Sequence, residues 1–180
     1  MSGLVVWVLA RPGDPGLRML EPPPEGVRFV VGWDPEAFDG APAPDAILDC
    51  WAGPTRLVAA LHRAPGVRWI HARSAGLDGV LAPEVVAHPS LLTNGRGAFS
   101  PALAEFVLGA LLFFLKDLRR LVRQQEAGAW EPFDMERLEG RTVGIVGYGD
   151  IGRAIAARLR PLGVRVLALR RQPERSEGDP

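Results

Sequence analysis

The sequence has few residues of several types, and each shortage excludes a class of protein. Cys50 is the only cysteine among 180 residues, which excludes an intrachain disulfide and a metal site built from cysteines. Lysine and arginine together number 21, as do aspartate and glutamate, so neither sign of charge is in excess. We therefore expect neither nucleic acid nor an anionic membrane as a partner, because both attract proteins with excess positive charge.

Long apolar runs are also missing. The longest apolar segment, Ala102 to Leu115, contains Glu105 and is shorter than the ~20 residues that a helix needs to cross a bilayer. It predicts a buried helix and not a membrane anchor. The apolar N-terminus, Met1 to Ala10, lacks the basic lead and the cleavage site of a secretory signal. Because the chain has a single thiol and no such signal, we expect a cytoplasmic protein.

Short apolar runs alternate with turn-rich and helical stretches in the first half of the chain. Five runs have the length and the side chains of buried strands: Leu4–Ala10, Val27–Val31, Ala46–Trp51, Val67–Ala72 and Ser90–Thr93. Pro54–His62 has the apolar spacing of a helix, with proline at a tolerated early position. This alternation predicts a parallel sheet covered by helices, in a unit that ends near Gly97.

The strongest helix signal follows. Ser100 is a good N-cap and Pro101 suits the first helical position. Apolar residues then recur at helical spacing as far as Val122, which predicts one long helix facing a core. Gly128 is expected to end this helix, and residues 129–140 form a connection.

A glycine motif carries the clearest chemistry. The β-rich run Thr142 to Val146 leads into Gly147, Tyr148, Gly149, Asp150, Ile151 and Gly152, then into an amphipathic helix that ends at Gly163 and a second strand, Val164 to Leu169. In such a βαβ unit the first glycine permits the turn, the second lets the backbone approach a pyrophosphate, and the third allows close packing of helix on strand. The helix amides then hold the phosphate oxygens. We predict that these six residues bind a dinucleotide.

The choice of cofactor is read at the end of the second strand. An NAD site places an acidic residue there for the ribose 2′-hydroxyl, whereas this chain has Arg170 and Arg171. Two guanidinium groups suit a 2′-phosphate, so NADP is expected in preference to NAD, although an exposed arginine pair at a strand end is also common.

Three blocks resemble the D-isomer-specific 2-hydroxyacid dehydrogenases, the family of phosphoglycerate dehydrogenase and glyoxylate/hydroxypyruvate reductase. The blocks are Val67 to Ile70 with Ser74 to Asp78, then Leu92 to Gly97 with Leu103 to Phe106, and finally Leu138 through the glycine motif to Arg171. Their order and spacing cover the chain from about Val67 onward. Asp150 departs from the family, which usually has a neutral or basic residue there; it could cap the helix or repel a pyrophosphate.

The resemblance implies an α/β architecture in three parts. Residues 1–98 would form a flavodoxin-like, parallel-sheet substrate domain, residues 99–129 a connecting helix, and residues 130–180 the first βαβ of an incomplete Rossmann domain. In the family, the loop matching Ala75, Gly76 and Leu77 presents backbone amides to the substrate carboxylate, which a glycine-containing turn can do. A simple turn is the alternative. Trp51 could lie at the same cleft, although a core position is expected for a tryptophan that ends a strand.

The resemblance also implies oxidoreductase activity with NAD(P)H on a small 2-oxo or 2-hydroxy acid such as glyoxylate or hydroxypyruvate, with a homodimer by analogy. The family's catalytic arginine, glutamate and histidine would lie beyond Pro180, and no histidine follows His88. Because hydride transfer needs a cation and a proton donor beside the nicotinamide, we expect this polypeptide alone to be inactive. It would be the front portion of a dehydrogenase or, alternatively, a non-catalytic nucleotide-binding or assembly module. Two strands would leave apolar sheet surface exposed, so association or partial disorder is expected near Thr142–Leu169.

Overall fold

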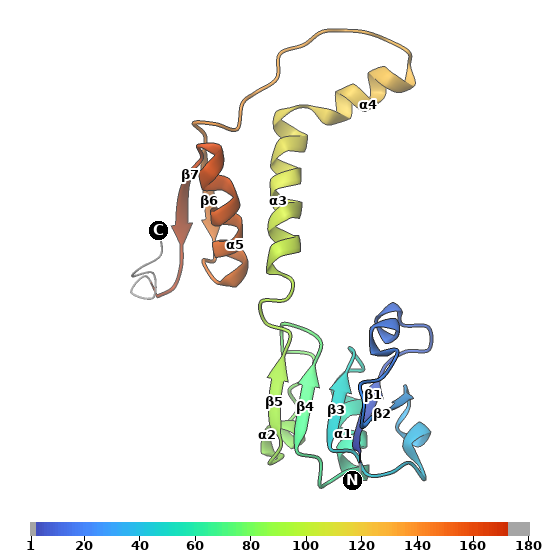
Figure 1. Cartoon of the computed structure of the whole chain (residues 1–180). Coiled ribbons are helices and arrows are strands. Elements are labelled where there is room, and N and C mark those ends of the chain that lie inside the picture. Colours follow the sequence, from blue (N-terminus) through green and yellow to red (C-terminus); the bar gives the residue numbers. More distant parts are fainter. Residues whose placement is uncertain (1–2, 173–180) are drawn as a thin grey trace. The chain divides into compact units, whose positions relative to one another are not determined.

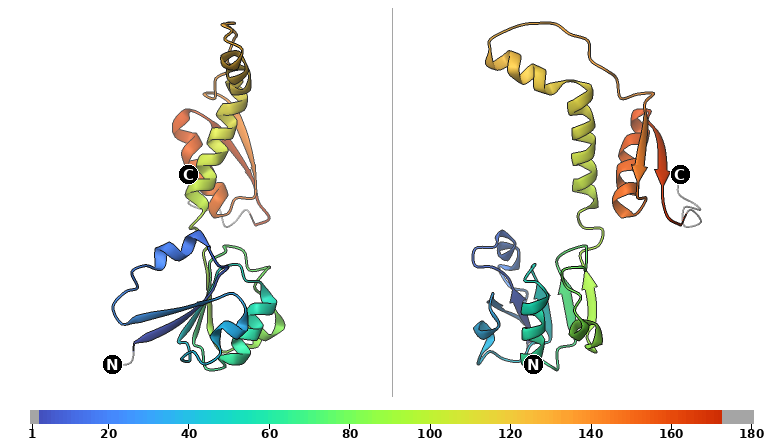
Figure 2. Two further views of the ribbon diagram at one scale, coloured as in Figure 1. Left: turned by 90° about the vertical axis from the view of Figure 1, so that its right-hand side faces the viewer. Right: turned by 180° about the vertical axis from the view of Figure 1, so that it is seen from behind.

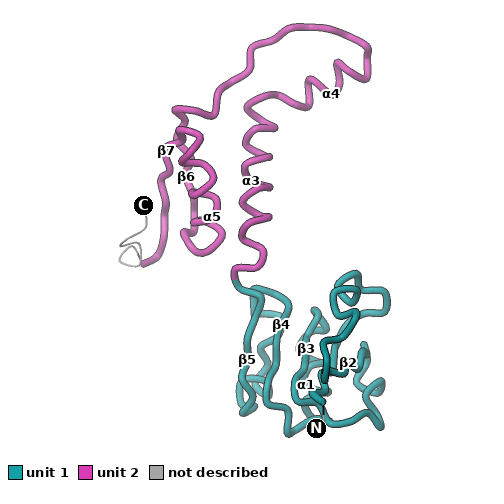
Figure 3. Tube along the Cα trace, in the orientation of Figure 1, with its two compact units in different colours: residues 1–96 teal, residues 97–180 magenta. Residues whose placement is uncertain are grey.

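A computed structural model describes residues 3–172 of the chain. The chain divides into two compact units, residues 1–96 and residues 97–180, which Figure 3 shows in different colours. Both are α/β units with parallel strands. In the described part of the chain, no helix combines the length and the apolar character needed to cross a membrane.

Unit 1 is built on a five-stranded parallel sheet (Figure 1). Its strands are β1 (Leu4–Leu9), β2 (Val27–Gly32), β3 (Ala46–Asp49), β4 (Trp69–Ala72) and β5 (Leu91–Asn94). They lie in the order β2-β1-β3-β4-β5, the flavodoxin-like order. The five predicted strands and the predicted fold class are confirmed. In such sheets ligands bind beyond the carboxyl ends of the strands, which makes the loops after β1, β3 and β4 candidates for a site.

Helices cover mainly one face of this sheet, as Figure 2 shows. The predicted helix over Pro54–His62 is present as α1 (Pro54–Arg63). Three further elements were not predicted: the short helix α2 (Pro83–Ala87) and the 3-10 turns η1 (Pro15–Leu20) and η2 (Pro35–Phe38). The main core joins the covered sheet face to α1, and its fully buried side chains include Leu9, Ile47, Leu57 and Ile70. A smaller cluster around Val8 and Cys50 packs on the other face against η1.

The prediction of a single long helix after Gly97 is wrong. Two helices are present, α3 (Ser100–Leu115) and α4 (Leu118–Glu126). Asp117 has a left-handed backbone, with φ of 44°, and its carboxylate accepts the N–H of Arg120 to start α4. The predicted cap is also displaced by one residue, because Phe99 takes the cap position and Ser100 is already helical. A polar residue that can cap a new helix therefore outweighed the continuing apolar spacing.

The rest of unit 2 is the predicted βαβ unit. It contains β6 (Thr142–Val146), α5 (Asp150–Leu159), the 3-10 turn η3 (Arg160–Leu162) and β7 (Arg165–Leu169), with β6 parallel to β7. One face of α3 packs with α5 around Leu138, Leu159 and Val164. The expected burial of the whole segment 102–115 is wrong, because in the described structure Ala104 is its one buried residue, and Phe106 and Phe114 are exposed. The expected apolar sheet surface is present, with Val146 87% exposed and Leu169 67% exposed.

Candidate functional site

The glycine motif forms a tight turn between β6 and α5. Gly147 has a φ of +94°, which an L-residue with a side chain rarely adopts, and its N–H donates to the Leu169 carbonyl at 2.8 Å. Gly152 lies against this turn, because a Cβ at position 152 would overlap the Gly147 carbonyl oxygen and approach Ile145 within 3.3 Å. The turn and the close approach of helix to strand therefore depend on two glycines.

The buried side chain of Tyr148 holds the turn against the rest of unit 2. Its ring is buried with Ile145 and Ala156, and its hydroxyl accepts a hydrogen bond from Arg160 of η3 at 3.2 Å. The side chain between the first two glycines therefore points into unit 2, and the backbone of the turn faces outward. This is the arrangement that a phosphate-binding loop requires.

The first turn of α5 carries three of the predicted cofactor residues, Asp150, Ile151 and Gly152, and Gly149 precedes it. Gly149 takes the cap position without a side-chain cap, and a Cβ there would meet no atom within 4 Å. Asp150 does not cap the helix; its carboxylate lies 3.7 Å from the Arg153 guanidinium, one turn along α5. Ile151 is partly exposed. The Arg153 charge offsets part of the repulsion that Asp150 would exert on a phosphate.

The predicted cofactor residues at the two strand ends come together. An open hollow of about 370 Å³ is lined by Gly147, Tyr148, Gly149, Arg170, Arg171 and Gln172. The hollow joins the glycine turn to the arginine pair because β6 and β7 are parallel neighbours and end at the same edge. Backbone amides and guanidinium groups are chemically suited to phosphate oxygens, so the residues present fit a dinucleotide.

Two side chains hold the loop after β4 by donating hydrogen bonds to the carbonyl groups of Ala75 and Gly76. The Asn94 side-chain amide donates to the Ala75 carbonyl at 2.7 Å, and the Ser74 hydroxyl donates to the Gly76 carbonyl at 2.7 Å. In a trans peptide the N–H points opposite to the preceding C=O, so the amides of Gly76 and Leu77 point away from these donors. Within residues 3–172, neither amide donates a hydrogen bond. The loop can therefore offer two N–H groups to an anion.

Ser74 and Asn94 were not predicted as functional residues. Both lie within the blocks that carry the family resemblance, and Asn94 is the only asparagine in the chain. Nothing in the local pattern shows that a side chain at position 94 reaches a carbonyl at position 75. The parallel pairing of β4 with β5 brings Ala72 beside Asn94 and makes this contact.

A second hollow, of about 310 Å³, adjoins this loop. It is lined by Asp49, Trp51, Gly53, Pro54, Ser74, Gly76, Gly79 and Val80. The core position expected for Trp51 is wrong, because the residue is 55% exposed and its φ is 61°. Strand β3 ends at Asp49, two residues before the predicted end, so Trp51 belongs to the loop and not to the sheet.

Comparisons with known proteins identify relatives of the chain in sequence and in fold. Residues 108–179 match the model of the D-isomer specific 2-hydroxyacid dehydrogenase, NAD binding domain. Glyoxylate reductase of Thermofilum pendens is 29% identical over 167 residues, which cover 86% of this chain and 48% of the relative. Glyoxylate/hydroxypyruvate reductase A of Serratia proteamaculans is 29% identical over 158 residues, covering 83% and 47%.

A solved D-isomer specific 2-hydroxyacid dehydrogenase family protein from Aeromonas salmonicida aligns with a TM-score of 0.72 at 25% identity, over 95% of this chain and 55% of that one. In sequence over residues 108–179, and in fold over 95% of its length, the chain is similar to the D-isomer specific 2-hydroxyacid dehydrogenases. It spans about half the length of the curated relatives it matches.

Two neighbouring titratable groups, Asp49 and Cys50, are buried at the end of β3. Burial raises the pKa of the Asp49 carboxyl, whose residue is 1% exposed, although the Ala52 N–H donates to one carboxylate oxygen at 3.1 Å. The other oxygen has no hydrogen-bond partner in the described structure. Burial also raises the pKa of the Cys50 thiol to about 11. Cys50 is therefore a protonated, unreactive thiol at neutral pH.

Asp49 should make the stability of unit 1 depend on pH. Because its pKa is raised on folding, the folded state binds the proton more tightly, and stability falls as pH rises from the unfolded pKa through the folded one. Asp49→Asn keeps the acceptor for Ala52 and removes the ionisation. We expect the melting temperature of this variant, relative to wild type, to rise by a few degrees between pH 4 and pH 7, measured by circular dichroism. A difference that is the same at both pH values would contradict this prediction.

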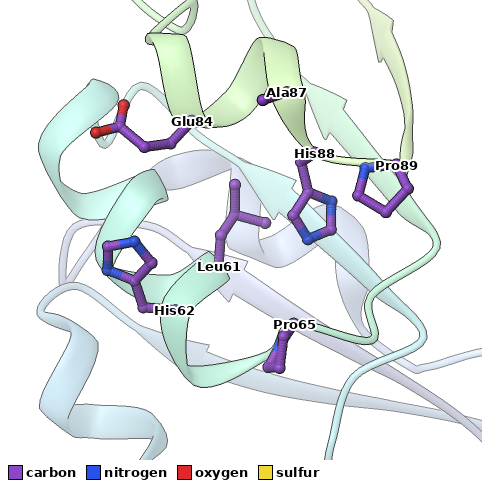
Figure 4. Close-up of a pocket in the computed structure, with 7 residues that line it drawn as sticks. All are labelled: Leu61, His62, Pro65, Glu84, Ala87, His88 and Pro89. Atoms are coloured by element: carbon purple, nitrogen blue, oxygen red, sulfur yellow. The ribbon is translucent and has the colours of Figure 1, made fainter.

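The three histidines of the chain lie in unit 1, away from the glycine turn. His71 Nδ1 pairs with the Thr93 hydroxyl at 2.8 Å on the sheet. His62 and His88 flank Leu61 in a hollow between α1 and α2 (Figure 4). His88 Nδ1 accepts the Ser90 N–H at 3.2 Å and lies 2.9 Å from the Ser90 hydroxyl. This hollow lies where chain segments enter β4 and β5, at the opposite edge of the sheet from the Ser74–Gly76 loop.

Proposed function

We propose that this chain supplies the dinucleotide-binding turn and the substrate-carboxylate loop of an oxidoreductase that reduces a small 2-oxo acid, such as glyoxylate or hydroxypyruvate, with NADPH. The relatives named glyoxylate reductase and glyoxylate/hydroxypyruvate reductase support the substrate class. The observation that carries the proposal is the hollow in which the glycine turn meets Arg170 and Arg171. The single buried thiol is compatible with a reducing cytoplasm as its setting.

The residues of the chain would bind and orient the reactants. The N-terminal amides of α5 and the turn at Gly147–Gly149 would hold the pyrophosphate, and the bound cofactor would supply the hydride. The amides of Gly76 and Leu77 would bind the substrate carboxylate, because their carbonyl neighbours are turned away by Asn94 and Ser74. We propose Ala75, Gly76 and Leu77 as substrate-binding residues and residues 147–152, 170 and 171 as cofactor-binding residues.

The cofactor preference can be tested with the arginine pair. We expect wild type to bind NADPH more tightly than NADH, and Arg170→Gln with Arg171→Gln to weaken NADPH roughly 5- to 10-fold while NADH changes little, because only NADPH carries the 2′-phosphate. Titration of nucleotide fluorescence measures both affinities. Arg165→Gln, at the exposed start of β7, is the matched control. Tighter NADH binding by wild type would reject the NADP preference.

A non-catalytic nucleotide-binding module is the second candidate. It is favoured by the position of all three histidines in unit 1, where none lines the hollow at the glycine turn. Binding of glyoxylate or hydroxypyruvate to the chain saturated with NADPH separates the two candidates. Shifts of the Gly76 and Leu77 amide NMR signals on adding either acid would support the dehydrogenase part, whereas NADPH binding without such shifts would support the module.

We also propose that unit 2 associates with a second copy of this chain through α3. Phe106 and Phe114 on this helix are 74% and 77% exposed, although both are large apolar side chains. Sedimentation velocity should therefore show a dimer, and Phe106→Glu should shift it to a monomer. Met19→Glu is the control, because Met19 is equally exposed but lies in unit 1. A wild-type monomer at all concentrations would reject this proposal.

A further inference from the structure

A paired arginine and aspartate connect two loops at the carboxyl edge of the unit 1 sheet. Arg73 Nη1 and Nη2 donate to the two carboxylate oxygens of Asp14 at 2.9 and 2.8 Å. The side chains are 28% and 12% exposed, so the pair is largely shielded from water. Gly16 makes room for it, because a Cβ at position 16 would overlap Nη1 of Arg73. A two-point contact of this kind fixes the plane of the guanidinium group as well as its place.

Trp51 lies on this fixed guanidinium group. The Arg73 guanidinium carbon is 4.2 Å from the centre of the Trp51 ring system, within the range of a cation–π contact. The left-handed backbone of Trp51 is costly for a bulky residue, and it persists only where the surroundings impose it. One such constraint is Asp49, which accepts the Ala52 N–H and closes the turn around position 51. The chain thus holds a large, exposed aromatic side chain in one place.

The Trp51 ring lies in the wall of the second hollow, beside the loop Ser74–Leu77 after β4, which we call the carboxylate loop. Trp51 lines this hollow together with Ser74 and Gly76, and its other walls include the apolar side chains of Pro54 and Val80. The charge of Arg73 is paired with Asp14 and is not available to a second anionic group on a ligand. A group that extends from a carboxylate bound at Gly76 and Leu77 would therefore meet a mainly aromatic and apolar surface, in which the buried Asp49 carboxyl is the one titratable lining group among the described residues.

We infer that Trp51 determines substrate specificity by selecting 2-oxo acids with an uncharged, apolar side chain, and that Arg73, held by Asp14, is a positioning residue for Trp51. This inference rests on the proposed carboxylate-binding role of the loop. It goes further because it narrows the small 2-oxo acids of that proposal to those with an apolar side chain; glyoxylate has no side chain and hydroxypyruvate has a polar one, so both would bind less tightly. An apolar side chain gains affinity by leaving water for such a surface, whereas a charged one does not.

The test compares two ligands on the full 180-residue chain. Pyruvate and 4-methyl-2-oxopentanoate are titrated separately while the amide signals of Gly76 and Leu77 are followed by NMR. We expect wild type to bind the branched acid roughly fivefold more tightly than pyruvate. Trp51→Ala should bring this ratio close to one, and Trp51→Phe should retain most of it. Arg73→Gln should lower the ratio as Trp51→Ala does, with pyruvate affinity within about twofold of wild type.

A second stacked pair provides the control. Arg56 lies 4.3 Å from the Trp33 ring centre but does not line the hollow, so Arg56→Gln should leave the ratio unchanged. A ratio that stays near the wild-type value in folded Trp51→Ala would overturn the inference and leave the carboxylate loop intact. If neither acid shifts the Gly76 and Leu77 signals in wild type, the proposed function of the loop fails instead.

Discussion

Replacing Gly152 by alanine is expected to destabilise unit 2 and to weaken NADPH binding roughly 30-fold. The added Cβ would overlap the Gly147 carbonyl oxygen, which is backbone and cannot rotate away. Helix α5 must then move off β6, at a cost of about 1–3 kcal/mol, which lowers the melting temperature by roughly 5–15 °C. The same movement would displace the helix amides from the phosphate position. Circular dichroism measures the first effect and nucleotide fluorescence the second.

Gly109 provides the matched control for this substitution. It is an exposed glycine in α3 of the same unit, and a Cβ there would meet no atom within 4 Å. Gly109→Ala should therefore leave NADPH binding unchanged and stabilise the helix by up to about 1 kcal/mol, because alanine has the higher helix propensity. Equal effects of the two substitutions would show that the close contact at position 152 is unimportant.

Replacing Asn94 by aspartate is expected to weaken pyruvate binding roughly 30-fold, which corresponds to about 2 kcal/mol. The Asn94 side chain donates to the Ala75 carbonyl at 2.7 Å, and a carboxylate has no proton to donate there. It would repel that carbonyl and add a negative charge beside an anion site. The loss can be measured from the NMR shifts of Gly76 and Leu77 during a pyruvate titration.

Two further variants separate the loop from the rest of unit 1. Ser74→Ala removes the donor to the Gly76 carbonyl without adding charge, so its loss of affinity should be smaller. Ser90→Ala removes a hydroxyl that pairs with His88 at the opposite edge of the sheet, and it should have no effect. Undiminished pyruvate affinity in Asn94→Asp would remove the physical basis of the carboxylate loop.

Both predictions depend on backbone groups whose orientation is set by neighbours. In the glycine turn, the neighbours are a buried Tyr148 ring and the backbone of β7. In the carboxylate loop, they are two side chains that each hold one carbonyl group. In both places, the groups that we propose to contact the pyrophosphate and the substrate carboxylate are backbone amides.

The strands and the helices α1 and α5 could be predicted from the sequence because their signals are local. Apolar runs, helical spacing and the turns that glycine and proline favour each depend on residues only a few positions apart in the sequence. The same local reasoning failed at Asp117, where a capping side chain ends one helix and starts the next. It failed again at Trp51, because a hydrophobic residue after a strand looks like part of that strand.

The sequence by itself determined the βαβ unit, with the three glycines in register with a strand before them and a helix after them, and the parallel α/β class of the first unit. Only the tertiary structure decided which groups face the two hollows. Asn94 reaches Ala75 because parallel strands end at the same edge, and Arg73 reaches Asp14 across 59 residues of chain. Such contacts depend on the pairing order of the strands, which no local periodicity contains.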